Sequence, residues 1–428
     1  MVRTGKKVFH VSLRLGAHRD RLPGQHLQKV EAMPDDPVIL VTGGMGFIGS
    51  HLVRRLIDQH PSATILNVDM NNYAAANGSR FFGGIGSQHH FQQSAEYEPV
   101  WPPPHLDNED RNPRDNLTGN SNHIWFQQNL AGCHGKLSVV RRVCEVYQPH
   151  YIYHLAAQSH VDRSIDDPTS FGTNVTGTQS LLEVARLSTR LEKFVYVSTD
   201  EVYGSLPPSG RRGGERLHPA FSGFSESHTV RCGNPYSASK AASEQFALAY
   251  HNTFGLPVVI TRGCNTYGKH QYPEKFIPVV CDNLLHDRQV PIYGDGQQRR
   301  QWLHVLDHVD GLIAAAAVGV PGQIYNLAAG LPSTNLSVVE LALWVFGKTS
   351  SLLKFVEDRP GHDRCYWICD EKAQDELQWR PVYGNSLQRN QALKETFEWY
   401  GSSEGRGWTK FVNHDSGKRL GLRQKESS

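Results

Sequence analysis

The chain has 428 residues, 39% of them hydrophobic, and a formal net charge of +2. At roughly 100–200 residues per domain, this length favours two packed domains. The small net charge gives no reason to expect a nucleic-acid partner. No segment approaches the ~20 apolar residues of a membrane-spanning helix, so we expect no membrane partner.

The seven cysteines are scattered, and only Cys365 and Cys369 lie close together in the sequence. No cluster of His and Cys completes a metal site, and we therefore expect no bound metal. An odd number of cysteines without a disulfide framework is typical of reduced, intracellular thiols. Because no apolar signal segment opens the chain, we expect a cytoplasmic protein.

Residues 1–37 differ from the rest in charge. The part before Glu31 holds seven Lys or Arg and one acidic residue, Asp20. We interpret them as a disordered extension. Such a basic segment is also typical of an organellar transit peptide, which leaves organelle targeting open.

The first regular elements follow this extension. Residues 38–41 form a short apolar run closed by glycines, which is typical of a buried parallel strand. Residues 52–57 are predicted to be helical and residues 63–68 to form a second strand. Residues 78–122 then break this rhythm with glycine, proline and polar residues, and we interpret them as a long mobile insertion.

Alternation of strands and helices resumes after the insertion. Strands are predicted at 124–126, 151–153, 194–197 and 258–260, and helices at 136–147, 174–187 and 236–254. This alternation predicts an α/β fold with a Rossmann-type doubly wound parallel sheet over residues 38–270. The shorter elements of 271–401 favour a smaller, mainly substrate-binding α+β domain, and the polar residues 402–428 a disordered tail.

A glycine-rich segment joins the first strand to the first helix. Gly43, Gly46 and Gly49 follow the pattern G-x-x-G-x-x-G, and such a turn brings backbone N–H groups and a helix N-terminus against a pyrophosphate. Asp69, 20 residues past Gly49, ends the second strand, where a carboxylate binds the adenosine ribose and favours NAD over NADP. The alternative is a structural tight turn with a surface aspartate.

Two polar groups predict the chemistry. Tyr236 and Lys240 stand four residues apart on one helix face, so that a nearby ammonium favours the phenolate that accepts a proton from a sugar hydroxyl. Thr199, Asp200 and Glu201 follow a strand end, where two carboxyls in different environments can act as acid and base. The alternatives are an amphipathic helix with a surface lysine, and plain solvated charges.

Longer motifs connect these groups. They are Thr199-Asp200-Glu201, His154-Leu155-Ala156-Ala157, Ser159-His160-Val161-Asp162-Arg163-Ser164, Pro235-Tyr236-Ser237-Ala238-Ser239-Lys240, Tyr272-Pro273-Glu274-Lys275, Tyr293-Gly294-Asp295-Gly296-Gln297-Gln298 and Asp358-Arg359-Pro360-Gly361-His362. From about Val38 to Tyr400 the chain resembles the extended short-chain dehydrogenases/reductases, and within them the dTDP-glucose 4,6-dehydratases. Thr-Asp-Glu is the most specific motif, because epimerases of this superfamily usually lack the Asp-Glu pair and the sugar decarboxylases typically carry Ser-Glu.

The resemblance implies a three-stage dehydration of a nucleotide-linked glucose with a tightly held NAD. Tyr236, helped by Lys240 and Thr199, would oxidise C4 by hydride transfer to NAD. Glu201 would remove the C5 proton, and Asp200 would protonate the C6 hydroxyl as it leaves. The hydride would then return to C6.

The resemblance also implies the residues around both ligands. Around the cofactor it places Gly43, Gly46, Phe47, Ile48, Gly49, Asp69, Asn129, Leu130, Leu155, Ala156, Ala157, Ser159, Thr173, Tyr236 and Lys240. Around the substrate it places Ser159, Thr199, Asn265, Lys275, Phe276, Pro291, Tyr293, Arg300, Asn335, Arg359 and His362. Guanidinium groups match phosphate oxygens, which suits two of these, Arg300 and Arg359, for the diphosphate.

The chain departs from the family pattern at five positions. Asn129 replaces an aspartate that binds the adenine amino group, and its amide oxygen can still accept that hydrogen bond. Thr266 replaces a common Asn, and Gln158 a common Glu near the nicotinamide pocket. Gln301 and Leu306 replace aspartates, which would weaken the ordering of the loop around Arg300.

Two other functions stay open on these grounds. One is a UDP-sugar epimerase or decarboxylase, and the other a catalytically weak nucleotide-sugar-binding protein. The sequence does not distinguish a thymine from a uracil nucleotide. Relatives form dimers through a bundle of helices, so that the resemblance implies a homodimer.

Overall fold

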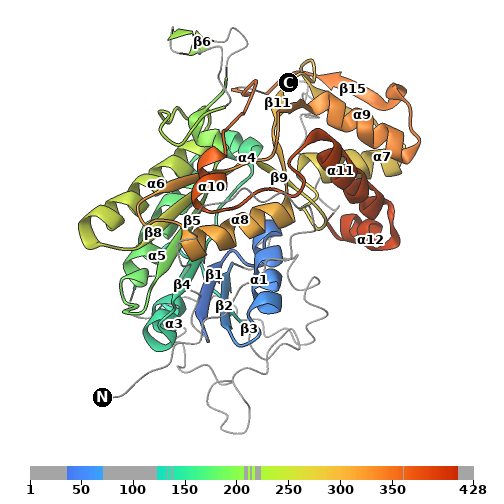
Figure 1. Cartoon of the computed structure of the whole chain (residues 1–428). Coiled ribbons are helices and arrows are strands. Elements are labelled where there is room, and N and C mark those ends of the chain that lie inside the picture. Colours follow the sequence, from blue (N-terminus) through green and yellow to red (C-terminus); the bar gives the residue numbers. More distant parts are fainter. Residues whose placement is uncertain are drawn as a thin grey trace, which may run out of the picture.

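A computed structural model of the chain describes residues 36–70, 123–132, 134–135, 138–206, 211–212, 215–216, 223–359 and 361–412 (Figure 1). The insertion predicted at 78–122 and nearly all of the extension predicted at 1–37 lie outside these residues. None of the helices in the described ranges is long and apolar enough to cross a lipid bilayer.

Seven parallel strands form the central sheet (Figure 1). In spatial order they are β13 (Ile324–Leu327), β8 (Val258–Gly263), β5 (Lys193–Thr199), β4 (Tyr151–His154), β1 (Val38–Thr42), β2 (Thr64–Asp69) and β3 (His123–Gln127). The strand order reverses between β1 and β4, the point at which ligands bind in doubly wound sheets. The predicted Rossmann-type α/β fold is confirmed.

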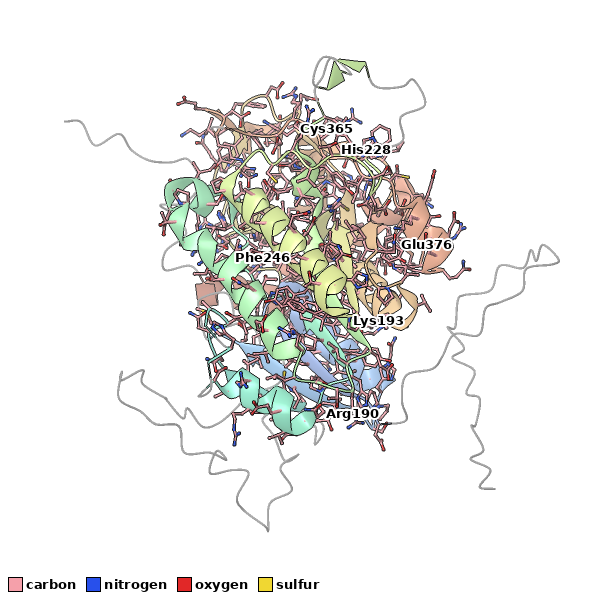
Figure 2. All side chains as sticks on the ribbon, turned by 90° about the vertical axis from the view of Figure 1, so that its left-hand side faces the viewer. Arg190, Lys193, His228, Phe246, Cys365 and Glu376 are labelled. Atoms are coloured by element: carbon pink, nitrogen blue, oxygen red, sulfur yellow. The ribbon has the colours of Figure 1, made fainter. Side chains whose placement is uncertain are left out.

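Helices cover both faces of this sheet because alternate strand residues point to opposite sides. One face carries α3 (Val139–Tyr147), α5 (Gly172–Ala185) and α6 (Pro235–Phe254), and the other carries α1 (Phe47–Gln59), α8 (Val305–Val318) and α10 (Glu371–Glu376). In β1, Leu40 packs in the first layer, whereas Ile39 and Val41 pack in the second. Figure 2 shows the first face from outside, with α5 and α6 side by side.

A smaller unit with its own hydrophobic core lies beyond the carboxyl edge of the sheet (Figure 1). It contains α7 (Phe276–Leu285), β10 (Val290–Tyr293), α9 (Asn335–Phe346), β15 (Leu353–Val356), α11 (Ser386–Gly401) and α12 (Ser403–Val412). Its core includes the buried side chains of Tyr267, Ile292, Phe397 and Tyr400. This unit supplies one wall of the site described below.

Short elements join the two units. They are α4 (Val161–Asp166), η1 (Thr169–Phe171), η2 (Asp200–Tyr203), β6 (Arg211–Arg212), β7 (Glu215–Arg216), β9 (Asn265–Tyr267), β11 (Arg299–Arg300), β12 (Trp302–His304), β14 (Ser333–Thr334) and η3 (Ser350–Leu352). Residues 271–401 are not confined to the smaller unit, because β13, α8 and α10 return to the large sheet.

The disordered tail predicted at 402–428 is wrong for residues 403–412, which form helix α12. Trp408 is the reason: its ring is buried against His270, and its indole N–H donates to the carbonyl oxygen of Gln271 at 3.2 Å. One large apolar side chain therefore docks a segment whose other residues are mostly polar. Residues beyond 412 lie outside the described part.

Candidate active site

The residues predicted to bind a dinucleotide meet at the carboxyl edge of the sheet. The glycine loop follows β1, Asp69 ends β2, and residues 155–157 follow β4. Since β1 and β4 are neighbours at the reversal of strand order, these segments surround the position where such sheets bind their ligands.

The glycine loop is closed on the protein side and open on the other. A Cβ atom at Gly43, whose φ is +75°, would lie 2.6 Å from the backbone nitrogen of Ala156, and one at Gly49 would lie 2.1 Å from the carbonyl oxygen of Gly43. Gly46 is the N-cap of α1 and has no side-chain cap, and a Cβ there would meet only that same oxygen, at 3.2 Å. The first amides of α1, including those of Phe47 and Ile48, are thus available to an anion, and the loop fits a pyrophosphate.

Asp69 joins the second strand to this loop. Its side chain is 8% exposed, and Oδ2 accepts a hydrogen bond from the backbone N–H of Met45 at 2.8 Å. Burial raises the pKa of Asp69 to about 6, against the hydrogen bonds from backbone N–H groups. The carboxyl therefore helps to order the loop, and its contact with a ribose stays a prediction.

The remaining residues predicted for the cofactor surround the same edge. Asn129 and Leu130 follow β3; Leu130 is buried, whereas Asn129 is exposed and its Oδ1 accepts from the N–H of Ala131 at 3.0 Å. Thr173, in the first turn of α5, donates to the carbonyl oxygen of Ser170 at 2.7 Å. Asn129 thus already uses part of the acceptor capacity that an adenine amino group would need.

The predicted catalytic groups come together at the end of β5. Thr199 ends the strand, Asp200 and Glu201 open η2, and Tyr236 and Lys240 lie on α6. The Thr199 hydroxyl lies 3.3 Å from Oδ1 of Asp200 and accepts from the N–H of Glu201, also at 3.3 Å. The Thr199 side chain also lowers the pKa of Tyr236, against the effect of burial. Thr199 therefore contacts the carboxyl of Asp200 and the backbone of Glu201, close to the tyrosine.

The two carboxyls lie in different environments. Asp200 is 2% exposed, and burial followed by the charge of Glu201 raises its pKa to about 8, against the opposing charge of Arg300. Burial also raises the pKa of Glu201, but a hydrogen bond from Nδ2 of Asn234 to Oε2, at 3.1 Å, is the largest effect that lowers it. A raised pKa favours the protonated form of Asp200 at neutral pH, and this form is suited to donate a proton.

Tyr236 and Lys240 are both buried, but no hydrogen bond joins their side chains. Burial, followed by the charge of Glu201, raises the pKa of Tyr236. Nζ of Lys240 donates to the carbonyl oxygen of Val197 at 2.7 Å and lies 4.3 Å from the ring centre of Tyr196; burial lowers its pKa to about 7. The structure thus shows no hydrogen bond through which Lys240 would favour a tyrosinate, and this role of Lys240 stays a prediction.

Helix α6 is anchored at both ends of its catalytic segment. At its start, Asn234 caps the helix by accepting from the N–H of Ser237 at 2.8 Å, and Pro235 occupies the first turn. One turn past Lys240, Glu244 forms a buried two-point ion pair with Arg262 of β8, at 3.1 and 2.6 Å. These contacts fix the helix against the sheet.

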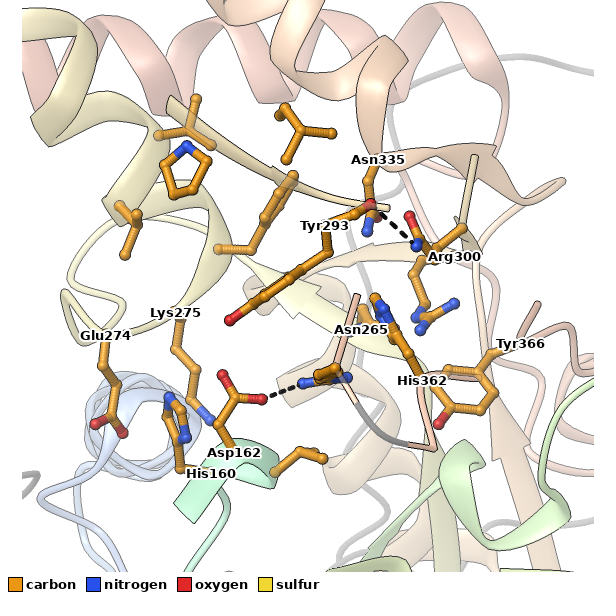
Figure 3. A pocket seen from close by; sticks show the side chains of 18 of the residues that line it. His160, Asp162, Asn265, Glu274, Lys275, Tyr293, Arg300, Asn335, His362 and Tyr366 are labelled. Atoms are coloured by element: carbon orange, nitrogen blue, oxygen red, sulfur yellow. Dashed lines mark hydrogen bonds and ion pairs between the residues drawn. The ribbon is translucent and has the colours of Figure 1, made fainter. Parts of the chain in front are cut away.

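A pocket of about 210 Å³ opens beside these groups (Figure 3). All residues predicted to bind substrate line it except Thr199: Ser159, Asn265, Lys275, Phe276, Pro291, Tyr293, Arg300, Asn335, Arg359 and His362. Of the catalytic groups, Glu201 lines it as well. The pocket therefore joins segments from both structural units, far apart in the sequence.

The basic residues of the pocket differ in their partners. Arg359 pairs with Asp162 at 2.5 Å, and Nδ1 of His362 lies 2.5 Å from the carboxyl of Asp358. Arg300 forms no ion pair with any described carboxylate. Its guanidinium donates to the backbone carbonyl oxygens of Arg299 and Asp363, at 2.8 and 2.9 Å, and stacks on Tyr366.

Residues 39–328 match the model of the NAD dependent epimerase/dehydratase family. The chain belongs to this family. It is 37% identical over 382 residues to a dTDP-glucose 4,6-dehydratase of Haemophilus influenzae, a match that covers 85% of this chain and 97% of the relative. A second dTDP-glucose 4,6-dehydratase, of Salmonella typhimurium, is 35% identical over 378 residues, covering 85% and 92%.

Solved structures agree with this family. The dTDP-glucose 4,6-dehydratase DesIV of Streptomyces venezuelae, solved with NAD bound, has a TM-score of 0.69 and 34% identity, covering 88% of this chain and 99% of its own. The UDP-glucose 4-epimerase of Thermotoga maritima has a TM-score of 0.65 and 24% identity, covering 85% and 98%, and shows the shared fold alone.

The departures of this family member have local substitutes. Gln301 is buried, donates to the carbonyl oxygen of Gly330 at 2.7 Å and accepts from the N–H of Ile368 at 2.8 Å, so that neutral hydrogen bonds hold the loops beside Arg300. Thr266 forms a hydrogen bond with Nδ1 of His308 at 2.8 Å.

Two further departures, Leu306 and Gln158, lie at the surface. Leu306 is 40% exposed in the first turn of α8. The side chain of Gln158 donates to the carbonyl oxygen of Ser170 at 3.2 Å, and Asn174 binds both the N–H and the C=O of Gln158, at 2.7 and 3.0 Å. The loop after β4 is thus held by amides, without a carboxylate.

Sequence reasoning missed several pocket residues. His160, Asp162, Glu274, Gln298, Trp302 and Tyr366 line the pocket, and we assigned no role to them. Asp162 and Glu274 lie inside motifs that carried the family resemblance, which was an available signal. Asn234 was also missed, although an Asn directly before a Pro and three residues before a Ser is a typical helix start.

Proposed function

We propose that this protein catalyses the NAD-dependent dehydration of a nucleotide-linked glucose, dTDP-glucose, to its 4-keto-6-deoxy sugar. The observation that supports this most is the Asp200–Glu201 pair, which lies beside Thr199 at the end of β5 and places Glu201 in the pocket. An epimerase needs no acid and base for the loss of water, whereas a dehydratase needs both. Relatives that match most of the chain carry the name dTDP-glucose 4,6-dehydratase.

The glycine loop, Asp69 and residues 155–157 would hold NAD at the carboxyl edge of the sheet. Bound NAD would bring a positive nicotinamide ring that favours ionised Tyr236, would take a hydride from C4 of the sugar and would return it to C6. We infer NAD rather than NADP because the carboxylate of Asp69 would repel a 2′-phosphate.

The chain's own residues would move the protons. Ionised Tyr236 would accept the proton of the C4 hydroxyl while a ketone forms at C4. That ketone acidifies the C5 proton, which Glu201 would remove. Protonated Asp200 would donate its proton to the C6 hydroxyl, which leaves as water. Glu201 would then return a proton to C5, and the proton held by Tyr236 balances the one that Asp200 gave up.

The cations of the pocket would bind the diphosphate. Arg300 is the strongest candidate because its guanidinium has no described carboxylate partner, while Arg359 already pairs with Asp162. Nζ of Lys275 donates to the carbonyl oxygen of Ser159 at 2.8 Å, which places it at the opposite wall. Guanidinium forks match phosphate oxygens better than an ammonium does.

Incubation with dTDP-glucose, and separately with UDP-glucose, followed by mass spectrometry tests the function. We expect a product lighter by one water from dTDP-glucose, and the same protein denatured beforehand should release NAD and no NADP. Tyr236→Phe is the matched control, which should bind the substrate and form no product. A chromatographically separate product of unchanged mass would identify an epimerase, and no product a binding protein.

We also propose the homodimer and the cytoplasmic location that the sequence analysis predicted. Sedimentation of the full chain tests the first, since a monomer at micromolar concentration would contradict it. Imaging of the full chain fused to a fluorescent protein at its C-terminus tests the second. Fluorescence confined to an organelle would show that residues 1–37 act as a targeting segment.

A further inference from the structure

Asn234 makes two contacts that connect the helix of the catalytic tyrosine to the proposed base. Its Oδ1 accepts from the backbone N–H of Ser237, at 2.8 Å, and caps α6. Its Nδ2 donates to Oε2 of Glu201, at 3.1 Å, across 33 positions of sequence. The cap also fixes which amide atom faces Glu201, because rotating the amide by 180° would put its NH2 group against the N–H of Ser237.

Among the described residues, the Glu201 carboxylate has one other hydrogen-bond donor, Tyr366. The hydroxyl of Tyr366 lies 3.4 Å from Oε2 of Glu201, but it also forms a closer hydrogen bond with Oδ2 of Asp363. A phenol carries one proton, so it cannot serve both carboxylates at once. The hydrogen bond from Asn234 is therefore the one on which the position of Glu201 depends.

The two contacts of Glu201 lie on the same carboxylate oxygen. Within the described residues, the hydrogen bonds to its side chain reach Oε2, and Glu201 lines the pocket. This arrangement holds one oxygen against the protein and leaves Oε1 to a proton in the pocket.

We propose that Asn234 is a positioning residue, which orients the carboxylate of Glu201 and keeps it ionised for removal of the C5 proton. This inference rests on the proposed function. Burial raises the pKa of Glu201, and Asn234 is the largest effect that lowers it. An ionised Glu201 in turn raises the pKa of Asp200. Asn234 thus helps to keep one carboxyl ionised beside a protonated neighbour.

Three variants separate this role from the helix cap. Asn234→Ser keeps a good N-cap and removes the amide donor, and Asn234→Asp keeps the cap and puts a carboxylate beside Glu201. Asn234→Ala removes both contacts. A role limited to the cap predicts that Asn234→Ser behaves like the parent in every respect, and that Asn234→Ala is less stable.

The measurement is the pH dependence of C5 hydrogen exchange with solvent, using C5-deuterated dTDP-glucose and the NAD-loaded protein. In Asn234→Ser we expect the acidic limb to move to higher pH by about one unit, because a hydrogen bond to a charged group is lost. In Asn234→Asp the acidic limb of the pH profile should move to still higher pH, because the new carboxylate repels the charge of Glu201. KM and melting temperature should stay close to those of the parent in Asn234→Ser.

A second readout does not depend on activity. The 13C resonance of the Glu201 side-chain carboxyl, assigned by its absence in Glu201→Gln, reports its pKa directly. If the parent exchanges C5 hydrogen and neither limb nor resonance changes in Asn234→Ser, the inference about Asn234 is wrong and the proposed function stands. If the parent shows no exchange and no product, the proposed function fails, and the carboxyl titration alone decides whether Asn234 controls Glu201.

Discussion

The catalytic groups at the end of β5 and the basic groups on the wall of the pocket are held in different ways. At the end of β5, Asp200 and Lys240 are 2% and 3% exposed and have no charged partner in direct contact among the described residues, and burial moves both pKa values toward neutrality. On the pocket wall, Arg359 and His362 have carboxylate partners at 2.5 Å.

This difference separates the groups suited to proton transfer from those suited to binding the substrate. A buried group without a counter-charge is held near the point of gaining or losing a proton, which is what acid–base catalysis requires. Paired Arg359 keeps its charge, whereas burial lowers the pKa of His362 to about 4, so that its imidazole is neutral at pH 7. Both pairs fix the shape of the wall. Arg300 differs from both, because it is buried, charged and held by backbone carbonyl oxygens, and this arrangement leaves its charge to an anion.

Substitutions of the catalytic groups at the end of β5 should reduce the rate of dehydration most. Glu201→Gln should reduce dehydration roughly 10²–10⁴-fold, because the base is lost. Single-turnover absorbance should show reduced cofactor accumulating while C5 exchange nearly stops. Asp200→Asn should lose water comparably slowly but keep C5 exchange. Equal C5 exchange in Glu201→Gln and the parent would remove Glu201 from the role of base.

On the pocket wall, Arg300→Ala should mainly raise KM for the nucleotide sugar. Loss of a charge-assisted contact of about 1.5–3 kcal/mol corresponds to roughly a 10- to 150-fold change in KM. Steady-state kinetics measures this change in KM. Arg300→Lys is the control, because it keeps the positive charge but lacks the two-point hydrogen bonding of a guanidinium. A fall in kcat with an unchanged KM would mean that Arg300 acts in the chemical step instead of in substrate binding.

The pH dependence of the elimination step should sharpen the same comparison. Asp200 acts as an acid only while protonated, and its pKa is raised to about 8. The rate should therefore fall about tenfold per unit as pH rises well above 8. It should also fall at acidic pH, where Glu201 becomes protonated. In Asp200→Asn the alkaline decline should disappear, and its persistence would assign that limb to another group.

The smallest catalytic effect is expected at Gln301. Gln301→Ala removes hydrogen bonds to Gly330 and Ile368, which should lower the free energy of unfolding by about 1–3 kcal/mol. KM should rise less than in Arg300→Ala, because Gln301 holds the wall without contacting an anion. Urea unfolding and kinetics on the same sample measure both. A larger rise in KM than in Arg300→Ala would contradict this division of roles.

Patterns within short segments were enough to predict much of this protein. The alternation of apolar strands with helices depends on local periodicity, and it gave the sheet and its doubly wound order. The glycine loop and the Tyr236–Lys240 spacing are local too, since a turn or one helix face fixes the distances within them. The family resemblance then extended this to the substrate wall, where ten of the residues it named line the pocket.

What the tertiary structure decided are contacts between distant segments and the effects of burial. Asn234 reaches Glu201 across 33 positions, and Arg359 reaches Asp162 across 197. Neither pair follows a local period. The return of β13 to the sheet and the docking of α12 by Trp408 are of the same kind. The pKa values of Asp200 and Lys240 shift because the whole fold excludes water from them, and this burial cannot be predicted from a short stretch of sequence.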